Sequence, residues 1–195
     1  ISLGLVGSEM CIRDSTSTGW LYLVLFTVIA YSAKGLRFKE KPFLDSITSS
    51  AHFVGPLIFA LALAGVESWN LGLTTIVISF TLWGIASHAF GAVQDVKADR
   101  AGGISSIATV IGARLTVRFA TAAYLIAGVL LLLSQSIATW AAVAAIPYLV
   151  IVGQFWNITD ETCEDANRGW KKFIWLNFFA GAIVSLLVIE FSKVG

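Results

Sequence analysis

Charged residues are scarce in this sequence. Only 13% of its 195 residues are Asp, Glu, Lys or Arg, while 57% are hydrophobic. A soluble domain carries roughly 25% charged residues, so the composition excludes an ordinary water-soluble protein. The apolar residues gather in runs of about twenty, the length that spans a bilayer as a helix. The sequence therefore predicts an integral membrane protein in a lipid bilayer.

Cysteine is also nearly absent, and the charges almost balance. Cys11 and Cys163 are the only cysteines, and neither lies at a metal-ligand spacing, so no disulfide or zinc framework is predicted. The net charge is +1. A net charge this close to zero does not point to any particular kind of partner. We expect no nucleic acid partner.

The first fifteen residues differ from the rest of the chain. Residues 1–15 begin without Met and scatter Gly, Ser and charged residues with no helical period. They also lack the basic start and the sustained apolar core of a signal peptide. We interpret them as a non-native or unstructured leader that precedes a chain whose own N-terminus is missing.

Six apolar spans follow the leader. We expect each to be a helix, because lipid cannot satisfy open backbone groups. Small residues such as Gly128, Gly153 and Gly181 would let these helices pack closely. The predicted fold class is all-α, a multi-pass transmembrane helical bundle. Its spans are residues 17–33, 44–65, 71–93, 116–134, 137–156 and 173–191.

Positive charge gathers in alternate loops. The loops after the first, third and fifth spans hold eleven of the thirteen Lys and Arg. The positive-inside rule places these three loops in the cytoplasm. The first span would then enter the cytoplasm from outside, so an odd number of spans would be missing if the complete protein starts in the cytoplasm.

Two carboxylates stand where the third span leaves the membrane. Asp95 and Asp99 are four residues apart, so on a helix they share one face. They repel each other unless cations satisfy them, and carboxylate oxygens suit Mg²⁺, which fills its other positions with water and substrate phosphates. The alternative is a solvated helix end in which Asp99 pairs with Lys97 or Arg100, because a lone DxxxD is a weak motif.

The first cytoplasmic loop is strongly basic. Residues 34–41 hold four cations and follow Tyr31 and Ser32. By itself such a loop would anchor to anionic lipid heads. Beside a carboxylate pair on the same side, however, it also suits a diphosphate: Arg and Lys meet the phosphate oxygens, while Mg²⁺ neutralises charge on the leaving group.

Together these segments resemble the UbiA membrane prenyltransferases. Residues 95–112 look like the family's second aspartate-rich motif, DxxxDxxxGxxT followed by a short apolar stretch and Gly. Gly103 and Ser105 or Ser106 occupy its later positions. Tyr31-Ser32 and residues 36–39 resemble the family's tyrosine-serine pair and basic loop. By this resemblance, residues 16–195 are the C-terminal two-thirds of a nine-helix domain, with six helices present.

Three further segments narrow the resemblance within the family. They look most like lycopene elongases of C50 carotenoid synthesis, although no physical argument links them to a carotenoid. These segments are residues 43–46, 49–56 and 167–172.

The resemblance implies ionisation of an allylic diphosphate and attack on the carbocation by an electron-rich acceptor. In an elongase the donor is dimethylallyl diphosphate and the acceptor is lycopene. Asp95 and Asp99 would hold Mg²⁺ on the diphosphate, and Tyr31 would face the cation. The site would lie at the cytoplasmic face of a prokaryotic plasma membrane. The residues expected to bind the diphosphate are Ser32, Arg37, Lys39, Lys41 and Arg100.

Aromatic residues and a histidine within the spans are further candidates. Phe53, Trp83 and Phe90 could line the prenyl cavity and stabilise positive charge, or they could belong to the core or face lipid. His88 lies seven residues before Asp95, two helical turns inward. It could line the same cavity or be a satisfied buried histidine.

The chain departs from the family pattern in two respects. Lys34-Gly35 stands where many members have Pro-Pro. The family's first aspartate-rich motif would precede the sequence, so half of the metal site is missing and we expect the chain alone to be inactive.

Two other functions remain open. One is a UbiA-type transferase with an aromatic or quinone-precursor acceptor. The other is a non-enzymatic transporter or lipid-binding module, disfavoured because no charge lies mid-span. Convergence of Asp95, Asp99, Arg37 and Lys39 on one cavity would favour an enzyme.

Overall fold

The computed structural model describes residues 15–66, 69–134 and 137–194. Within these ranges the chain is helical and contains no β-strand, which confirms the predicted all-α class. The predicted leader, residues 1–15, lies outside the described residues apart from Ser15.

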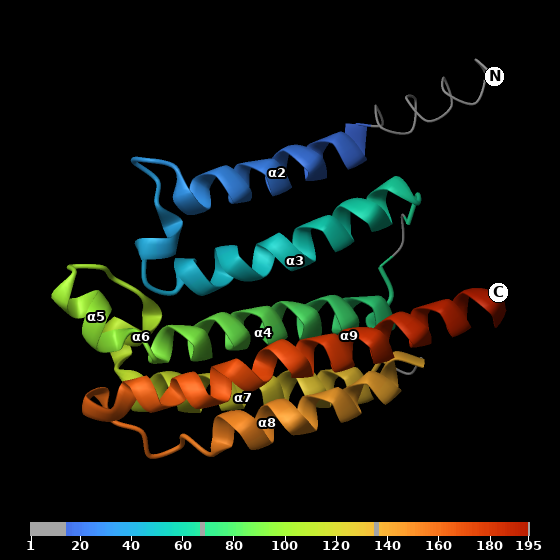
Figure 1. Cartoon of the computed structure of the whole chain (residues 1–195). Helices are drawn as coiled ribbons and strands as arrows, with labels where there is room; N and C mark the ends of the chain where they lie inside the picture. Colours follow the sequence, from blue (N-terminus) through green and yellow to red (C-terminus); the bar gives the residue numbers. More distant parts are fainter. Residues whose placement is uncertain (1–14, 67–68, 135–136, 195) are drawn as a thin grey trace.

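Long helices line up side by side and form the body of the structure (Figure 1). They are α2 (Ser15–Ser32), α3 (Leu44–Leu63), α4 (Leu71–Val93), α7 (Ala113–Leu132), α8 (Ala145–Gly153) and α9 (Asn167–Val194). Shorter elements connect them: η1 (Phe38–Glu40), α5 (Val96–Ala101), α6 (Ile107–Ile111), η2 (Ile137–Ala144) and η3 (Asp160–Ala166). Among the described residues, α3, α4 and α7 are long and apolar enough to cross a membrane.

Two of the predicted spans differ from the structure. The fifth was expected to be one helix over residues 137–156, but its first half is the 3-10 segment η2. Pro147 explains the change, because it has no N–H to donate to the preceding turn. The last helix begins at Asn167 rather than at Phe173. Hydropathy marks the apolar part of a helix, whereas backbone hydrogen bonding here continues through the polar residues 167–172.

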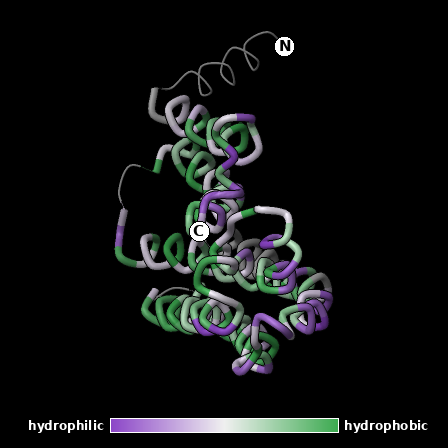
Figure 2. The backbone as a smooth tube through the Cα atoms, turned by 90° about the vertical axis from the view of Figure 1, so that its left-hand side faces the viewer, coloured by the Kyte–Doolittle hydropathy of each residue, from purple (hydrophilic) through white to green (hydrophobic). Residues whose placement is uncertain are grey.

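The three basic loops lie at one end of the bundle. The α2–α3 loop, the α5–α6 segment and the α8–α9 connection all appear on the left of Figure 1. Seen from that end, hydrophilic stretches gather in the loops, whereas the helices behind them are mostly hydrophobic (Figure 2). The structure therefore places at one end the three loops that the charge pattern predicts to lie on one side of the membrane.

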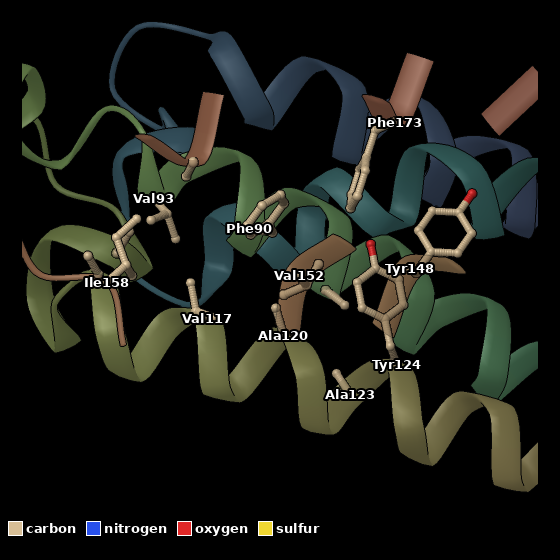
Figure 3. Packing of buried hydrophobic residues seen from close by; sticks show 14 of the residues in the cluster. Phe90, Val93, Val117, Ala120, Ala123, Tyr124, Tyr148, Val152, Ile158 and Phe173 are labelled. Atoms are coloured by element: carbon tan, nitrogen blue, oxygen red, sulfur yellow. The ribbon is translucent and has the colours of Figure 1, made fainter. Parts of the chain in front are cut away.

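Aromatic side chains fill the core between α4, α7, α8 and α9 (Figure 3). Tyr124 and Tyr148 stack with ring centroids 5.0 Å apart, and Phe173 meets Tyr148 edge-on at 5.3 Å. Such ring pairs prefer offset or edge-to-face geometry. Phe90 is fully buried against Phe173, so it belongs to the core rather than to a substrate cavity.

Small residues let neighbouring helices approach closely. A Cβ added at Gly84 of α4 would lie 2.5 Å from Oγ and 3.0 Å from Cα of Ser50 on α3. Ser50 also donates a hydrogen bond to the carbonyl of Thr81 at 2.8 Å. Gly128 similarly faces Ala145 of α8, whereas nothing lies within 4 Å of the Cβ position at Gly181. Gly84 therefore sets the distance between α3 and α4.

The substitution Gly84→Ala is expected to destabilise the protein by roughly 1–3 kcal/mol, because the new methyl group forces the α3 backbone to move. Thermal unfolding in detergent micelles, followed by tryptophan fluorescence, measures the change. Gly181→Ala is the matched control, since its methyl group meets open space and alanine favours a helix. Equal stability of the two variants would contradict the close α3–α4 contact.

Candidate functional site

Asp95 and Asp99 stand one helical turn apart at the end of α4. Asp95 is the N-cap of α5, and its carbonyl accepts the N–H of Asp99 at 2.8 Å. Asp95 is exposed and Asp99 is half-buried. The short helix α5 thus presents both carboxylates at the end of the bundle that carries the basic loops.

The later residues of the aspartate-rich motif close this turn. Gly103 has φ 71°, and its N–H donates to the carbonyl of Arg100 while that of Ile104 donates to the carbonyl of Asp99. This is the Schellman pattern that ends a helix and favours glycine. Ser106 then caps α6, exchanging side-chain and backbone hydrogen bonds with Thr109. Glycine and the hydroxyl residue at these motif positions therefore shape the loop that holds the carboxylates.

No ion pair among the described residues includes Asp95 or Asp99. Lys97 lies 4.0 Å from Glu164, and Arg100 lies 2.6 Å from Asp160. The alternative in which Asp99 pairs with Lys97 or Arg100 is therefore wrong for this structure. Both neighbouring cations instead face η3.

The pKa values of both carboxyl groups are raised above the ordinary value of 3.8. Partial burial raises the pKa of Asp95. Partial burial, and then the negative charge of Asp95, raise the pKa of Asp99. A divalent cation between the carboxylates would relieve both effects.

The chemistry of this donor set fits Mg²⁺. Mg²⁺ is held by one or two protein carboxylates together with water and substrate phosphates. Within the described residues, no group of three or more His, Cys, Asp and Glu side chains could enclose a metal ion. Asp95 and Asp99 alone therefore leave most coordination positions to water and substrate.

Arg100 locks the aspartate-rich segment to the rest of the bundle. Its guanidinium donates to the carboxylate of Asp160 at 2.6 Å and to the carbonyl of Thr109 at 2.8 and 3.1 Å. The other oxygen of Asp160 accepts the N–H of Ala113 at 2.7 Å. Gly112, with φ 82°, leaves room for this contact, since a Cβ there would lie 3.2 Å from Asp160.

Asp160 is consequently a structural acceptor. The sequence predicts that Asp160, Glu161, Glu164 and Asp165 form a solvated acidic loop; Asp160 is partly exposed, and its carboxylate is in addition held by Arg100 and Ala113. The N–H of Ala113 and then the Arg100 guanidinium hold the pKa of its carboxyl below the ordinary value. Arg100 is hydrogen-bonded to Asp160. Its expected contact with a diphosphate stays a prediction.

A buried carboxylate, Asp45, joins the first basic loop to the aspartate-rich segment. The side chain is fully buried at the start of α3 and accepts the N–H groups of Ser46 at 2.7 Å and Ile107 at 2.8 Å. Phe43, with φ 68°, turns the chain into α3 just before it. Asp45 belongs to the segment 43–46 that resembles lycopene elongases, but it is not among the predicted site residues. The preference of acidic residues for the first turn of a helix was a signal for its place, although not for its burial.

Tyr31 lies in a small polar cluster between α2, α3 and α4. Its hydroxyl is 3.5 Å from Nε2 of His88, whose Nδ1 is 3.1 Å from Oγ of Ser46. The ring of His52 meets Tyr31 edge-on, with centroids 5.0 Å apart.

The basic loop is at the surface. Arg37 pairs with Glu40, and Nζ of Lys41 lies 4.9 Å from the centroid of the Phe38 ring. Lys39 and Ser32 are exposed. In the described part of the chain, no hydrogen bond or ion pair joins this loop to Asp95 or Asp99. The predicted site residues share one end of the bundle, where the buried Asp45 joins the start of α3 to α6.

A cavity of about 420 Å³ lies elsewhere at this end, between α8 and the start of α9. Phe155, Arg168 and Lys172 are among its lining residues, and none of the predicted site residues is.

The start of α9 packs against the end of α4, close to Asp95. Asn167 donates to the side chain of Gln94, the residue before Asp95. A Cβ added at Gly169 would lie 2.6 Å from the Phe155 ring, and one added at Gly91 would lie 3.0 Å from the Trp170 ring. Residues 167–172 thus hold α9 against the carboxylate segment, a physical role that their sequence did not reveal.

Comparison with known proteins identifies one family. The model of the UbiA prenyltransferase family matches residues 1–181. A lycopene elongase/hydratase of Corynebacterium glutamicum is 47% identical over 178 residues, which cover 91% of this chain. The C(50) beta-cyclic carotenoids biosynthesis protein LbtBC of a Dietzia species is 51% identical over 174 residues, 89% of this chain.

The chain matches only part of the length of each relative. A lycopene elongase/hydratase of Halobacterium salinarum is 40% identical over 96 residues, which cover 48% of this chain and 34% of that protein. The chain spans 62% of the Corynebacterium protein and 40% of the Dietzia protein. No solved structure gives a significant match.

The hydrogen bonds that Asp160 accepts from Arg100 and Ala113 predict that the stability of the protein depends on pH. Because the folded pKa of Asp160 is lowered, its stabilising contribution is complete above the ordinary value of 3.8 and is lost as the pH falls through the lower folded value. At neutral pH, Asp160→Asn should lower the free energy of unfolding by about 1 kcal/mol. This is the value of a charged hydrogen bond after it has been weakened by solvent screening.

The measurement is the difference in Tm between Asp160→Asn and the unmodified protein, followed from pH 7 downward in detergent. The difference should shrink below about pH 3.8. Asp165→Asn is the control, since within the described part of the chain Asp165 makes a single ion pair, an exposed one with Arg168. A Tm difference that stays constant throughout would contradict the lock.

Proposed function

The chain belongs to the UbiA prenyltransferase family, and on that basis we propose that the protein containing it transfers a prenyl group from an allylic diphosphate to a lycopene-type carotenoid. The transfer takes place in the membrane, at the cytoplasmic end of the helical bundle. A prokaryotic plasma membrane suits the organisms of the relatives.

One observation carries the proposal. Asp95 and Asp99 are presented together on α5 while the two adjacent cations, Lys97 and Arg100, are directed toward η3. Two neighbouring carboxylates without a counter-charge suit a metal-bound diphosphate better than a solvated helix end. Mg²⁺ bound there would neutralise the negative charge that develops on the diphosphate.

Side chains of this chain supply the remaining roles. Arg37, Lys39 and Lys41 surround η1 at the same end, where they bind the diphosphate oxygens. Ser32, at the end of α2, donates to the diphosphate. Tyr31 faces the allylic cation with its ring. The apolar helices around the site exclude water, which would otherwise capture the cation.

The acceptor is the least constrained part of the proposal. The names of the bacterial relatives, lycopene elongase/hydratase and a C(50) carotenoid biosynthesis protein, support a carotenoid. Dimethylallyl diphosphate is then the donor, because each elongation adds one five-carbon unit. An aromatic or quinone-precursor acceptor is the outcome to test against it.

The test uses the complete gene product that contains this chain, expressed in membranes of a lycopene-producing host. Pigments are extracted and weighed by mass spectrometry. The unmodified protein should yield carotenoids heavier than lycopene by one or two five-carbon units. The double substitution Asp95→Asn, Asp99→Asn should lower that yield by at least about a hundredfold, comparable to the loss of a preorganised electrostatic contact.

Asp165→Asn is the matched control, because it removes an exposed carboxylate at the same end of the bundle. In isolated membranes, chelation should abolish transfer and added Mg²⁺ should restore it. Full activity of the double variant would refute the metal role. Unchanged lycopene with a well-expressed protein would refute the carotenoid acceptor, and aromatic acceptors would then be supplied.

A further inference from the structure

His88 is held between two hydroxyl groups that come from two other helices. Its Nδ1 lies 3.1 Å from Oγ of Ser46 on α3, and its Nε2 lies 3.5 Å from the hydroxyl of Tyr31 on α2. Ser46 is buried, whereas His88 and Tyr31 are only partly covered. The ring is therefore fixed on the Ser46 side and has its looser contact on the Tyr31 side.

This setting suits an imidazole that gains a proton. A protonated histidine donates from both nitrogens, and here each nitrogen faces a hydroxyl oxygen that can accept. The carboxylate of Asp45 is buried next to Ser46, the residue whose hydroxyl lies 3.1 Å from Nδ1 of His88. Asp45 has no ion-pair partner in the described part of the chain, so its negative charge is available to stabilise a positive charge nearby.

The proposed transfer requires such a proton acceptor. The C–O bond of the allylic diphosphate breaks, and diphosphate leaves with the bonding electron pair. The terminal alkene of the carotenoid supplies two electrons to form the new C–C bond, which leaves a cation on the adjacent carbon. Loss of a proton from a carbon beside that cation restores a double bond and completes the elongation.

We propose that His88 accepts this proton at Nε2, at the position where Tyr31 faces the cation. The inference rests on the proposed function and assigns one more residue to it. In the resting state Nδ1–H donates to Ser46, and Nε2 carries the lone pair. After the transfer, Nε2–H donates to Tyr31, and the Asp45 carboxylate balances the new charge.

Neighbouring groups fit this role less well. The oxygens of Asp45 accept backbone N–H groups from Ser46 and Ile107 in the buried interior. His52 touches Tyr31 through its ring edge, and no hydrogen bond among the described residues holds its imidazole in place. A phenol such as Tyr31 is a weaker base than an imidazole. Of these neighbouring groups, His88 combines basicity with a hydroxyl oxygen near each ring nitrogen.

The test compares two amide substitutions of His88 in the complete gene product. His88→Asn places an amide near the Nδ1 position and His88→Gln places one near the Nε2 position, and neither amide is basic. Ser87→Ala is the matched control, because Ser87 is the preceding residue and points toward Tyr124, 2.7 Å away. Membranes receive dimethylallyl diphosphate and lycopene, and four quantities are measured: diphosphate released, elongated carotenoid, hydrated carotenoid and dimethylallyl alcohol.

We expect both His88 variants to continue releasing diphosphate, since ionisation precedes the proton transfer. The elongated carotenoid formed per diphosphate should fall at least about a hundredfold relative to Ser87→Ala, the lower end of losses for general bases. Hydrated carotenoid should rise correspondingly, because water captures the carotenoid cation that is not deprotonated, whereas dimethylallyl alcohol reports capture of the allylic cation before transfer.

A merely structural role of His88 would lower all products together and leave their ratio unchanged, and that result would overturn the proposal. Unchanged activity in either variant would overturn it as well. If the unmodified protein makes no elongated carotenoid, the proposed function itself fails and the inference falls with it.

Discussion

The buried carboxylate of Asp45 is the contact on which the candidate site depends. It accepts the N–H of Ser46 in the first turn of α3 and the N–H of Ile107 at the start of α6. A buried carboxylate without such donors would be costly, so these two helices must begin beside each other. The Tyr31 and His88 cluster is thereby fixed relative to the loop that carries Asp95 and Asp99.

The surrounding bundle is built from packing and polar contacts, as the bilayer requires. Lipid is as apolar as leucine, so burial alone does not hold membrane helices together. Close approach at Gly84 joins α3 to α4. A hydrogen bond between the hydroxyl groups of Ser87 and Tyr124 joins α4 to α7, and one from Tyr148 to Asn177 joins α8 to α9.

Much of the fold could be predicted from the sequence because it follows from the length of apolar runs. Both ends of α4 and the starts of α3 and η2 lie where the spans were expected. The Asp95 and Asp99 pair was recognisable from spacing and from its place at the end of a span. The ion-pair partner of Arg100 could not be recognised from the sequence, because Arg100 binds Asp160, sixty residues away, and not the neighbouring Asp99. His88 likewise remained undecided until its two hydroxyl partners on other helices were known.

Two of the contacts around the aspartate-rich segment bear on the order in which the protein is made. Arg100 is held by Asp160, and Gln94 is bound by Asn167, so the partners are separated by 60 and 73 residues. A ribosome adds these residues after the aspartates have left the exit tunnel. The two carboxylates therefore reach the membrane surface before the side chains that orient their loop exist. These two contacts form only after Asp160 and Asn167 have been added, and a nascent chain halted before Asp160 carries the motif without them.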